Sequence, residues 1–84
     1  PQRVCNQLWL FTEQTLMDEV GRAQIINAPT HMEIAIMLNV SRETVTRVFR
    51  QLQQSKIVSR DGPNNLIINE PEKLKQIADG KIVL

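Results

Sequence analysis

The sequence has few of the residue types that disulfides, metal sites and membrane spans require. It has one cysteine, Cys5, and one histidine, His31, in 84 residues, so an internal disulfide is excluded and a metal site of standard ligand count is not expected. It has no tyrosine, and Trp9, Phe11 and Phe49 are its only aromatic residues. No apolar run approaches the roughly 18 residues that span a bilayer, and no basic-then-apolar leader is present. We therefore expect one soluble domain with a modest core, from a reducing compartment.

Catalytic patterns are missing as well. The sequence shows no nucleophile beside a base, no carboxylate pair in a cleft and no glycine-rich loop for phosphates. A chain of 84 residues is also too small to enclose a substrate well. We therefore do not expect an enzyme, and we expect no cofactor in this domain.

Positive and negative charges nearly cancel over the whole chain, but they do not cancel in one segment of it. The net charge at pH 7 is only +1, which by itself argues against a nucleic-acid partner. Residues 41–60, however, contain five basic residues and one acidic residue, so this segment carries +4 and the other 64 residues carry −3. The basic residues are Arg42, Arg47, Arg50, Lys56 and Arg60. Such asymmetry steers polyanions to one face, although charged helix faces are more often simply solvated.

Apolar spacing and turn residues predict the order helix, strand, helix, turn, helix, hairpin, helix. The first helix follows from Val4, Leu8 and Phe11, which recur at helical spacing. We expect helices over about 3–13, 31–38, 42–54 and from Pro71 to just before Gly80, a strand over 23–26, and hairpin strands over 56–60 and 66–69 around Gly62.

Capping residues place the two central helices close together along the chain. Thr30 and Glu33 form a T-x-x-E capping box at the start of the first of these helices. Asn39 suits the left-handed conformation that ends a helix, and Ser41 suits the cap of the next helix. The two helices therefore meet across a three-residue turn.

The helix over 42–54 has two distinct faces when it is projected at about 100° per residue. The apolar face holds Val45, Val48, Phe49 and Leu52, and the polar face holds Arg42, Glu43, Thr46, Arg47, Arg50, Gln53 and Gln54. A Glu43–Arg47 pair at i, i+4 is compatible with a plain solvent face. Arginines that flank a helix N-terminus also suit phosphates, and arginine with glutamate can read guanine and cytosine in a major groove.

The segment "THMEIAIMLNVSRETVTRVFRQLQQSKIV" resembles the helix-turn-helix of the cyclic-AMP receptor and fumarate-nitrate regulator (Crp/Fnr) family of bacterial transcription factors. The second helix of that motif opens with the same serine, arginine, glutamate, threonine run. Asn39 stands where the family usually has glycine, and His31 where it usually has a basic side chain. The resemblance is strong from Thr30 to about Asn69. It implies an α+β winged helix-turn-helix fold, with about four helices and a small antiparallel β wing over 57–69.

The resemblance also implies roles for individual residues on double-stranded DNA. Arg42, Glu43 and Arg47 would read base edges, with Thr46 as a further candidate. Contacts to phosphates would come from Thr30, His31, Ser41, Thr44, Arg50 and Gly62. For His31, a solvated side chain is the competing interpretation, and a phosphate contact there would be weak and pH-sensitive.

Other conspicuous residues have structural interpretations. We expect Trp9 and Phe49 in the core, and Cys5 as a small buried apolar residue. On the helix over 31–38 the expected core face is Ile34, Ala35, Met37 and Leu38. This leaves Met32 and Ile36 pointing away from the core. We expect these two side chains either to be covered by a second domain or to form an interaction patch.

Family members carry an effector-sensing β-barrel and a long dimerisation helix before the DNA-binding domain. The resemblance therefore implies that residues 1–84 are a single DNA-binding domain without the effector-binding domain of its parent protein, whose effector is unknown. The expected parent is a cytoplasmic homodimer on a two-fold symmetric operator, with RNA polymerase as a further candidate partner and no membrane contact. A winged-helix module that binds proteins rather than DNA is the alternative.

Overall fold

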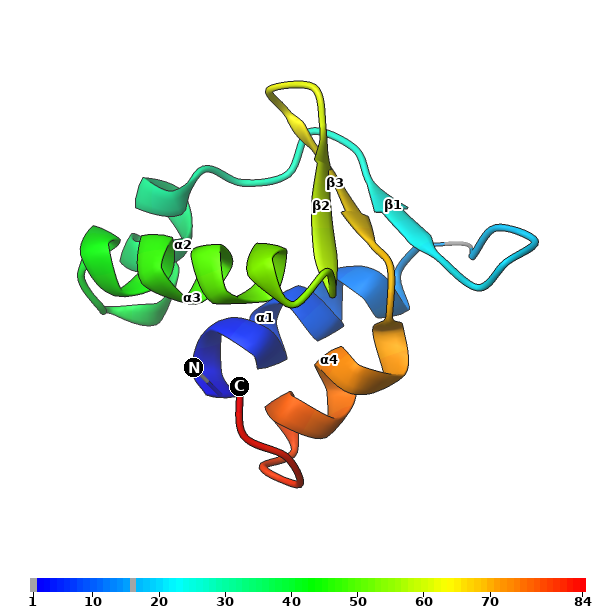
Figure 1. The fold of residues 1–84 in the computed structure, drawn as a ribbon. Helices are drawn as coiled ribbons and strands as arrows, with labels where there is room; N and C mark the ends of the chain where they lie inside the picture. The colour runs from blue at the N-terminus through cyan, green and yellow to red at the C-terminus, as the bar shows by residue number, and fades with distance from the viewer. Residues whose placement is uncertain (1, 16) are drawn as a thin grey trace.

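Residues 2–15 and 17–84 are described by a computed structural model, in which they form a helical layer with a small sheet (Figure 1). The elements are α1 (Gln2–Glu13), β1 (Ala23–Ile25), α2 (His31–Leu38), α3 (Arg42–Gln54), β2 (Val58–Asp61), β3 (Asn65–Ile68) and α4 (Pro71–Ala78). The order of elements and the bounds of α2 and α3 agree with those predicted. The α+β winged helix-turn-helix class is confirmed.

Local hydrogen bonds fix the turn between α2 and α3. The backbone N–H of Glu33 donates to Thr30 Oγ1 at 3.1 Å, and Thr30 N–H donates to Glu33 Oε1 at 2.9 Å, so the predicted capping box is present. Asn39 ends α2 in the left-handed region with φ 55°. Ser41 Oγ then accepts from Thr44 N–H at 3.1 Å. The entry to α3 is therefore set by residues within one turn of it.

The far end of α3 uses Lys56 in a role that the sequence did not predict. Lys56 has φ 60°, although it is neither glycine nor asparagine. Its N–H donates to the carbonyl of Gln53 at 3.1 Å, and Ile57 N–H donates to the carbonyl of Leu52 at 3.0 Å. This is the hydrogen-bond pair of a Schellman motif, and it turns the chain directly from α3 toward β2.

Replacing Lys56 with glycine is expected to raise the free energy of unfolding by about 1 kcal/mol, because glycine adopts positive φ without the steric cost that a side chain brings. Urea denaturation followed by circular dichroism would measure the change. Lys73→Gly, in the exposed interior of α4, is the matched control and should destabilise instead. A loss of stability in Lys56→Gly would contradict the assigned backbone conformation.

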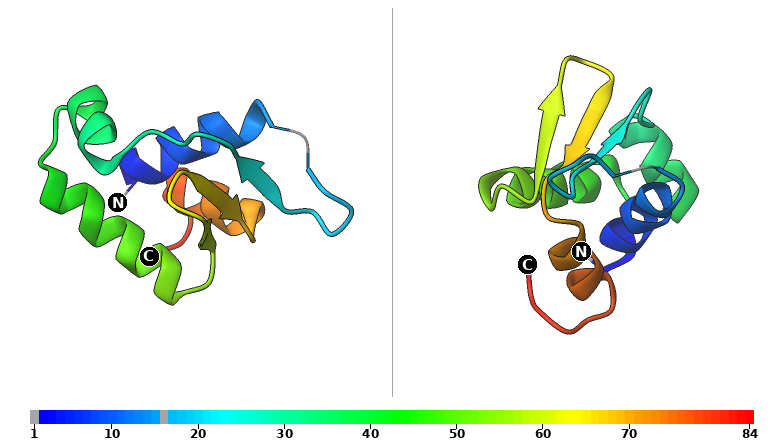
Figure 2. Two further views of the ribbon diagram at one scale, coloured as in Figure 1. Left: turned by 90° about the horizontal axis from the view of Figure 1, so that it is seen from above. Right: turned by 90° about the vertical axis from the view of Figure 1, so that its right-hand side faces the viewer.

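The strands form one antiparallel sheet in the order β1-β3-β2 (Figure 2). In the wing, Asp61 pairs with Asn65, so only three residues form the tip, and Gly62 has φ 75° there. The predicted strands 56–60 and 66–69 were therefore displaced by one or two residues. The first of them begins later because Lys56 and Ile57 form the C-terminal cap of α3. The pairing of β1 with β3, through Ile25 and Leu66 among others, was not predicted.

The core lies where α3, the sheet, α1 and α4 meet. Val45, Val48 and Leu52 are fully buried there, and Phe49 is 2% exposed, as predicted. Cys5 is also buried, and burial raises the pKa of its thiol to about 11, so the thiol stays protonated at neutral pH. The prediction for Trp9 was wrong: its ring is only half-buried.

The surroundings of Trp9 explain its partial exposure. Its indole N–H donates to Glu13 Oε1 at 2.7 Å, and Lys75 Nζ lies 5.8 Å from the ring centroid. Both partners are exposed charged residues, one on α1 and one on α4. Because an indole carries a polar N–H, the edge of the core suits it better than the centre.

One face of α2 is more exposed than predicted. Met32 and Ile36 point away from the core as expected, with 49% and 72% of their surface exposed. Met37 was assigned to the core and is 52% exposed, which corrects the prediction. At about 100° per residue, Met37 lies as far from the centre of the buried arc around Ile34 and Ala35 as Met32 does.

Candidate nucleic-acid interface

The polar face of α3 is presented to the outside as one surface. Arg42, Glu43, Arg47 and Arg50 are exposed, while Thr46 is half-buried between them. These five residues line a shallow groove of about 410 Å³. The structure thus brings together all four residues predicted to read base edges and one of those predicted to bind phosphate.

The basic side chains of this groove are not used in ion pairs within the described residues. There the ion pairs are Arg22 with Asp18 at 3.1 Å and Lys73 with Glu70 at 3.4 Å. Glu43 and Arg47 have the spacing of a helical pair, yet they do not form one. The interpretation of this face as a self-paired solvent surface therefore loses its main support.

Hydroxyl groups surround the first turn of α3. Ser41 Oγ and Thr44 Oγ1 lie 2.8 Å apart and share one hydrogen bond. Since two hydroxyls contribute two protons and this bond uses one, the other proton remains for an outside acceptor. Thr30 and Gly62 are also exposed, at the start of α2 and at the tip of the wing.

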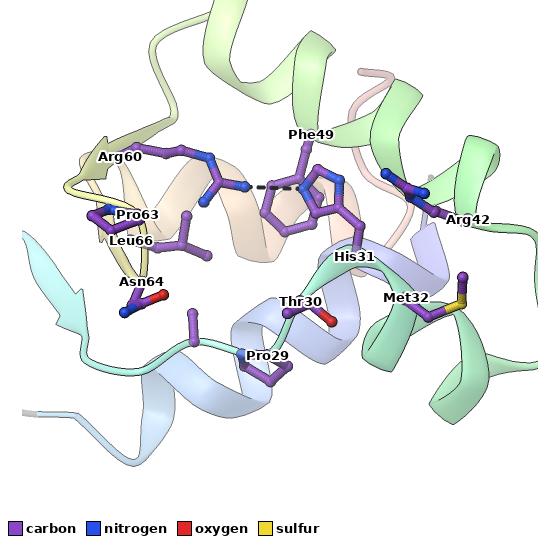
Figure 3. A pocket seen from close by; sticks show the side chains of 11 residues that line it. Pro29, Thr30, His31, Met32, Arg42, Phe49, Arg60, Pro63, Asn64 and Leu66 are labelled. Carbon is purple, nitrogen blue, oxygen red and sulfur yellow. Dashed lines mark hydrogen bonds between the residues drawn. The ribbon is translucent and has the colours of Figure 1, made fainter.

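His31 lies in a different setting from the one expected. It is half-buried, so the competing interpretation of a solvated side chain holds only in part. Its Nδ1 is 3.0 Å from Thr46 Oγ1. Its Nε2 is 3.1 Å from Arg60 Nη2, the contact drawn in Figure 3. Its ring centroid lies 4.6 Å from that of Phe49, with the planes tilted by 34°. His31 thus joins α2 to both α3 and the wing.

The contacts of His31 define its protonation state. Arginine can only donate, so Nε2 must accept from Arg60, which leaves the proton on Nδ1 to donate to Thr46. Burial lowers the pKa of the His31 imidazole, and the positive charges of Arg60 and Arg42 lower it further. The imidazole is therefore neutral at pH 7.

We expect His31 to make the domain less stable as the pH falls through about 6.5, the ordinary histidine pKa. Above that pH both the folded and the unfolded chain hold a neutral imidazole. Below it the unfolded chain takes up a proton that the folded domain resists, so the free energy of unfolding decreases. Urea denaturation at pH 7.5, 6.5 and 5.5 would show this decrease in the wild type.

The His31→Gln variant is the control for this pH dependence. Glutamine keeps a hydrogen-bonding amide but has no proton to gain in this range. The stability of the variant relative to the wild type should therefore improve as the pH falls. If the two proteins lose stability in parallel, His31 is not the group responsible.

Arg60 bonds to His31, yet the sequence did not assign it to a site. It had been counted only within the basic segment of the chain. It lies 29 residues from His31, and no short-range pattern links the two positions. Side chains alternate between the two faces of a strand, so the position of Arg60 in β2 could have placed it on an outer face of the wing. That pattern could not have placed it beside an imidazole.

Two kinds of feature are missing from residues 2–15 and 17–84. No helix there is long and apolar enough to cross a membrane. Over the same residues, no group of three His, Cys, Asp or Glu side chains lies together as a metal site would need.

Comparison with known proteins identifies the family of the chain. A family model described as the Crp-like helix-turn-helix domain matches residues 2–77. No curated protein sequence matches the chain significantly.

Several solved structures share the fold. Oxidized CprK in complex with o-chlorophenolacetic acid superposes with a TM-score of 0.82 at 18% identity, over 93% of this chain and 32% of that one. The CO-dependent transcription factor CooA from Carboxydothermus hydrogenoformans gives 0.81 at 23% identity, over 92% and 35%. The catabolite activator protein of Thermus thermophilus gives 0.74 at 31% identity, over 96% and 34%.

The chain thus spans about a third of the length of these solved chains, which are 32% to 35% covered. The match of the family model, by contrast, extends over nearly the whole chain, from α1 through most of α4. The protein therefore belongs to the Crp-like helix-turn-helix domain family and is a DNA-binding domain of a transcription regulator.

Proposed function

We propose that this domain binds one half-site of a two-fold symmetric operator, with α3 in the major groove and the wing along the sugar-phosphate backbone. The observation that carries the proposal is the division of α3 into a fully buried apolar face and an exposed face of three arginines and a glutamate. An α-helix fits the width of a major groove, and only its exposed face can then meet the bases.

On this proposal, Arg42, Glu43 and Arg47 select the sequence. An arginine can donate two hydrogen bonds to O6 and N7 of guanine, and a glutamate can accept one from N4 of cytosine. The half-site is therefore expected to contain at least one G·C pair opposite Arg47 and Glu43. Thr46 has a smaller part, since its hydroxyl already accepts from His31 and keeps one proton to donate.

The phosphate contacts come from residues around this face. Ser41 and Thr44 at the start of α3, Thr30 at the start of α2, Arg50 on α3 and the backbone at Gly62 are the proposed donors, together with His31. Contacts of this kind fix the register of the domain on DNA and supply most of its salt dependence.

The parent protein is proposed to be a cytoplasmic homodimer that contains an effector-binding domain. A two-fold operator needs two half-sites about one helical turn apart, which a dimer spans. An isolated domain should bind a half-site more weakly than the dimer binds both, because it lacks the gain from linking two binding events. RNA polymerase is a proposed further partner, and no cofactor is proposed for the domain itself.

An amide NMR titration with short duplexes would test the proposal, because it detects weak binding by a single domain. One duplex carries a guanine-containing half-site, the second a scrambled sequence, and each is used at low and high salt. We expect shifts in residues 41–50, at His31 and near Gly62, larger for the half-site and reduced by salt. Shifts elsewhere, or none at low salt, would favour a protein-binding module instead.

A further inference from the structure

A second cavity lies beside the proposed base-reading face and has the chemistry of an anion site. It measures about 430 Å³ and lies between the start of α2, α3 and the wing (Figure 3). Arg42, Arg60 and His31 line it, together with Thr30, Asn64 and six apolar or proline residues. Among the described residues that line it there is no carboxylate. Two arginines without an acidic neighbour favour a negatively charged occupant.

Two nitrogen atoms at this cavity are placed to share one oxygen atom. Arg60 Nη2 and His31 Nε2 are 3.1 Å apart, and in the free domain the first donates to the second. A proton added to Nε2 removes the acceptor and leaves two donors facing each other. An anionic oxygen that lies within normal hydrogen-bond distance of both, about 2.8 Å, resolves this conflict.

We propose that His31 and Arg60 together bind one backbone phosphate of DNA, and that His31 takes up one proton from solvent as the phosphate binds. The proton adds to Nε2, while Nδ1–H keeps its bond to Thr46. Arg60 exchanges the imidazole for a phosphate oxygen. This inference rests on the proposed DNA binding and adds a two-residue phosphate site across α2 and β2.

The charged groups near His31 support proton uptake only when an anion is present. From α3 it faces Arg42, and from the wing Arg60, and both disfavour a second positive charge in the free domain. The nearest acids along the chain are engaged elsewhere: Glu33 with the backbone of Thr30, and Asp61 with Gln24 Nε2 at 2.9 Å. Glu43 on α3 is exposed, but it lines the neighbouring groove and not this cavity. A phosphate would therefore be the main negative charge beside the ring.

A phosphate ion or a free nucleotide has the same chemistry as a backbone phosphate, but the location favours DNA. Arg42 lines both this cavity and the groove on the exposed face of α3. A duplex seated on that groove thus brings its backbone close to the cavity. Titration with inorganic phosphate at millimolar concentration distinguishes a free-anion site from a DNA site.

The first test follows the imidazole of His31 itself, whose NMR signal is unambiguous because the chain has one histidine. Its ring proton shift is recorded from pH 5 to 8.5 for the domain alone, with the half-site duplex, with the scrambled duplex and with inorganic phosphate. We expect both duplexes to raise the His31 pKa by about one unit, a contact that does not depend on sequence. An unchanged pKa on bound DNA would overturn the proposal, as would an equal rise with inorganic phosphate alone.

The second test measures the dissociation constant by fluorescence anisotropy over the same pH range. Linkage then predicts that wild-type binding tightens about tenfold as the pH falls, since one unit of pKa corresponds to a factor of ten. His31→Gln should lose this pH dependence, and Arg60→Gln should weaken binding and flatten it. Lys73→Gln, an exposed charge on α4, is the matched control and should keep the slope. An equal slope in wild type and His31→Gln would overturn the site.

The two proposals can fail separately. If both duplexes raise the pKa of His31 but bind equally well, the phosphate site holds and base reading by α3 fails. If the half-site is preferred while the pKa of His31 stays the same, base reading holds and the phosphate site fails. If no duplex binds at any pH, both proposals are overturned.

Discussion

Replacing Arg47 with alanine is expected to reduce discrimination at one base pair of the half-site by about 1 to 3 kcal/mol, or about 5-fold to 150-fold. Arg47 is exposed, lines the groove on α3 and forms no ion pair among the described residues. Its guanidinium is therefore available to donate two hydrogen bonds to a guanine. Selection of bound sequences from a randomised half-site would show the lost preference as one position that becomes degenerate.

Arg50→Ala is the control for this experiment. Arg50 lies one turn further along the same helix and is proposed to contact a phosphate. Its loss should weaken binding to every sequence by a similar factor and should reduce the salt dependence, with the sequence preference unchanged. A uniform loss in Arg47→Ala would place Arg47 among the phosphate contacts and contradict its assignment to a base.

Replacing Phe49 with alanine is expected to lower the free energy of unfolding by about 3 to 5 kcal/mol. The side chain is 2% exposed, and its removal would leave a cavity between α3 and the sheet. An 84-residue domain has a total stability of about 4 to 13 kcal/mol, so the loss is a large fraction of it. Urea denaturation followed by circular dichroism would measure it.

Phe49→Leu provides the comparison, because leucine keeps much of the buried volume. It should cost clearly less than alanine, in the order expected if the effect comes from packing. The ring of His31 lies against Phe49, so the alanine variant should also expose the imidazole and raise its pKa toward the ordinary value. A cost below 1 kcal/mol for alanine would contradict the assignment of Phe49 to the core.

Much of the fold could be predicted because its signals are local. The capping box of Thr30 and Glu33, the left-handed Asn39 and the cap Ser41 each act within about one helical turn, so a short stretch of sequence contains both partners. The two faces of α3 follow from its strong periodicity for the same reason. The predicted residues of the base-reading face therefore came together as expected.

The remaining errors involve contacts between distant segments. Nothing near Trp9 in the sequence shows that Lys75 lies over its ring, and nothing near His31 shows that Arg60 bonds to it. Met37 was misplaced because α2 buries a narrower arc than an apolar sequence suggests. The positive φ of Lys56 was not predicted, because lysine does not itself favour that region of the backbone.

The short joint between α3 and the wing restricts how far these two elements can move relative to each other. Ser55, Lys56 and Ile57 are the only residues between α3 and β2. The Ile57 side chain is buried, its N–H donates to Leu52 and its carbonyl accepts from Asn69. Because its backbone is hydrogen-bonded and its side chain is buried, this joint cannot act as a hinge between α3 and the wing. We therefore expect a regulator built on this domain to engage or release its operator by rotating the domain as one rigid body, with α3 and the wing at a constant angle.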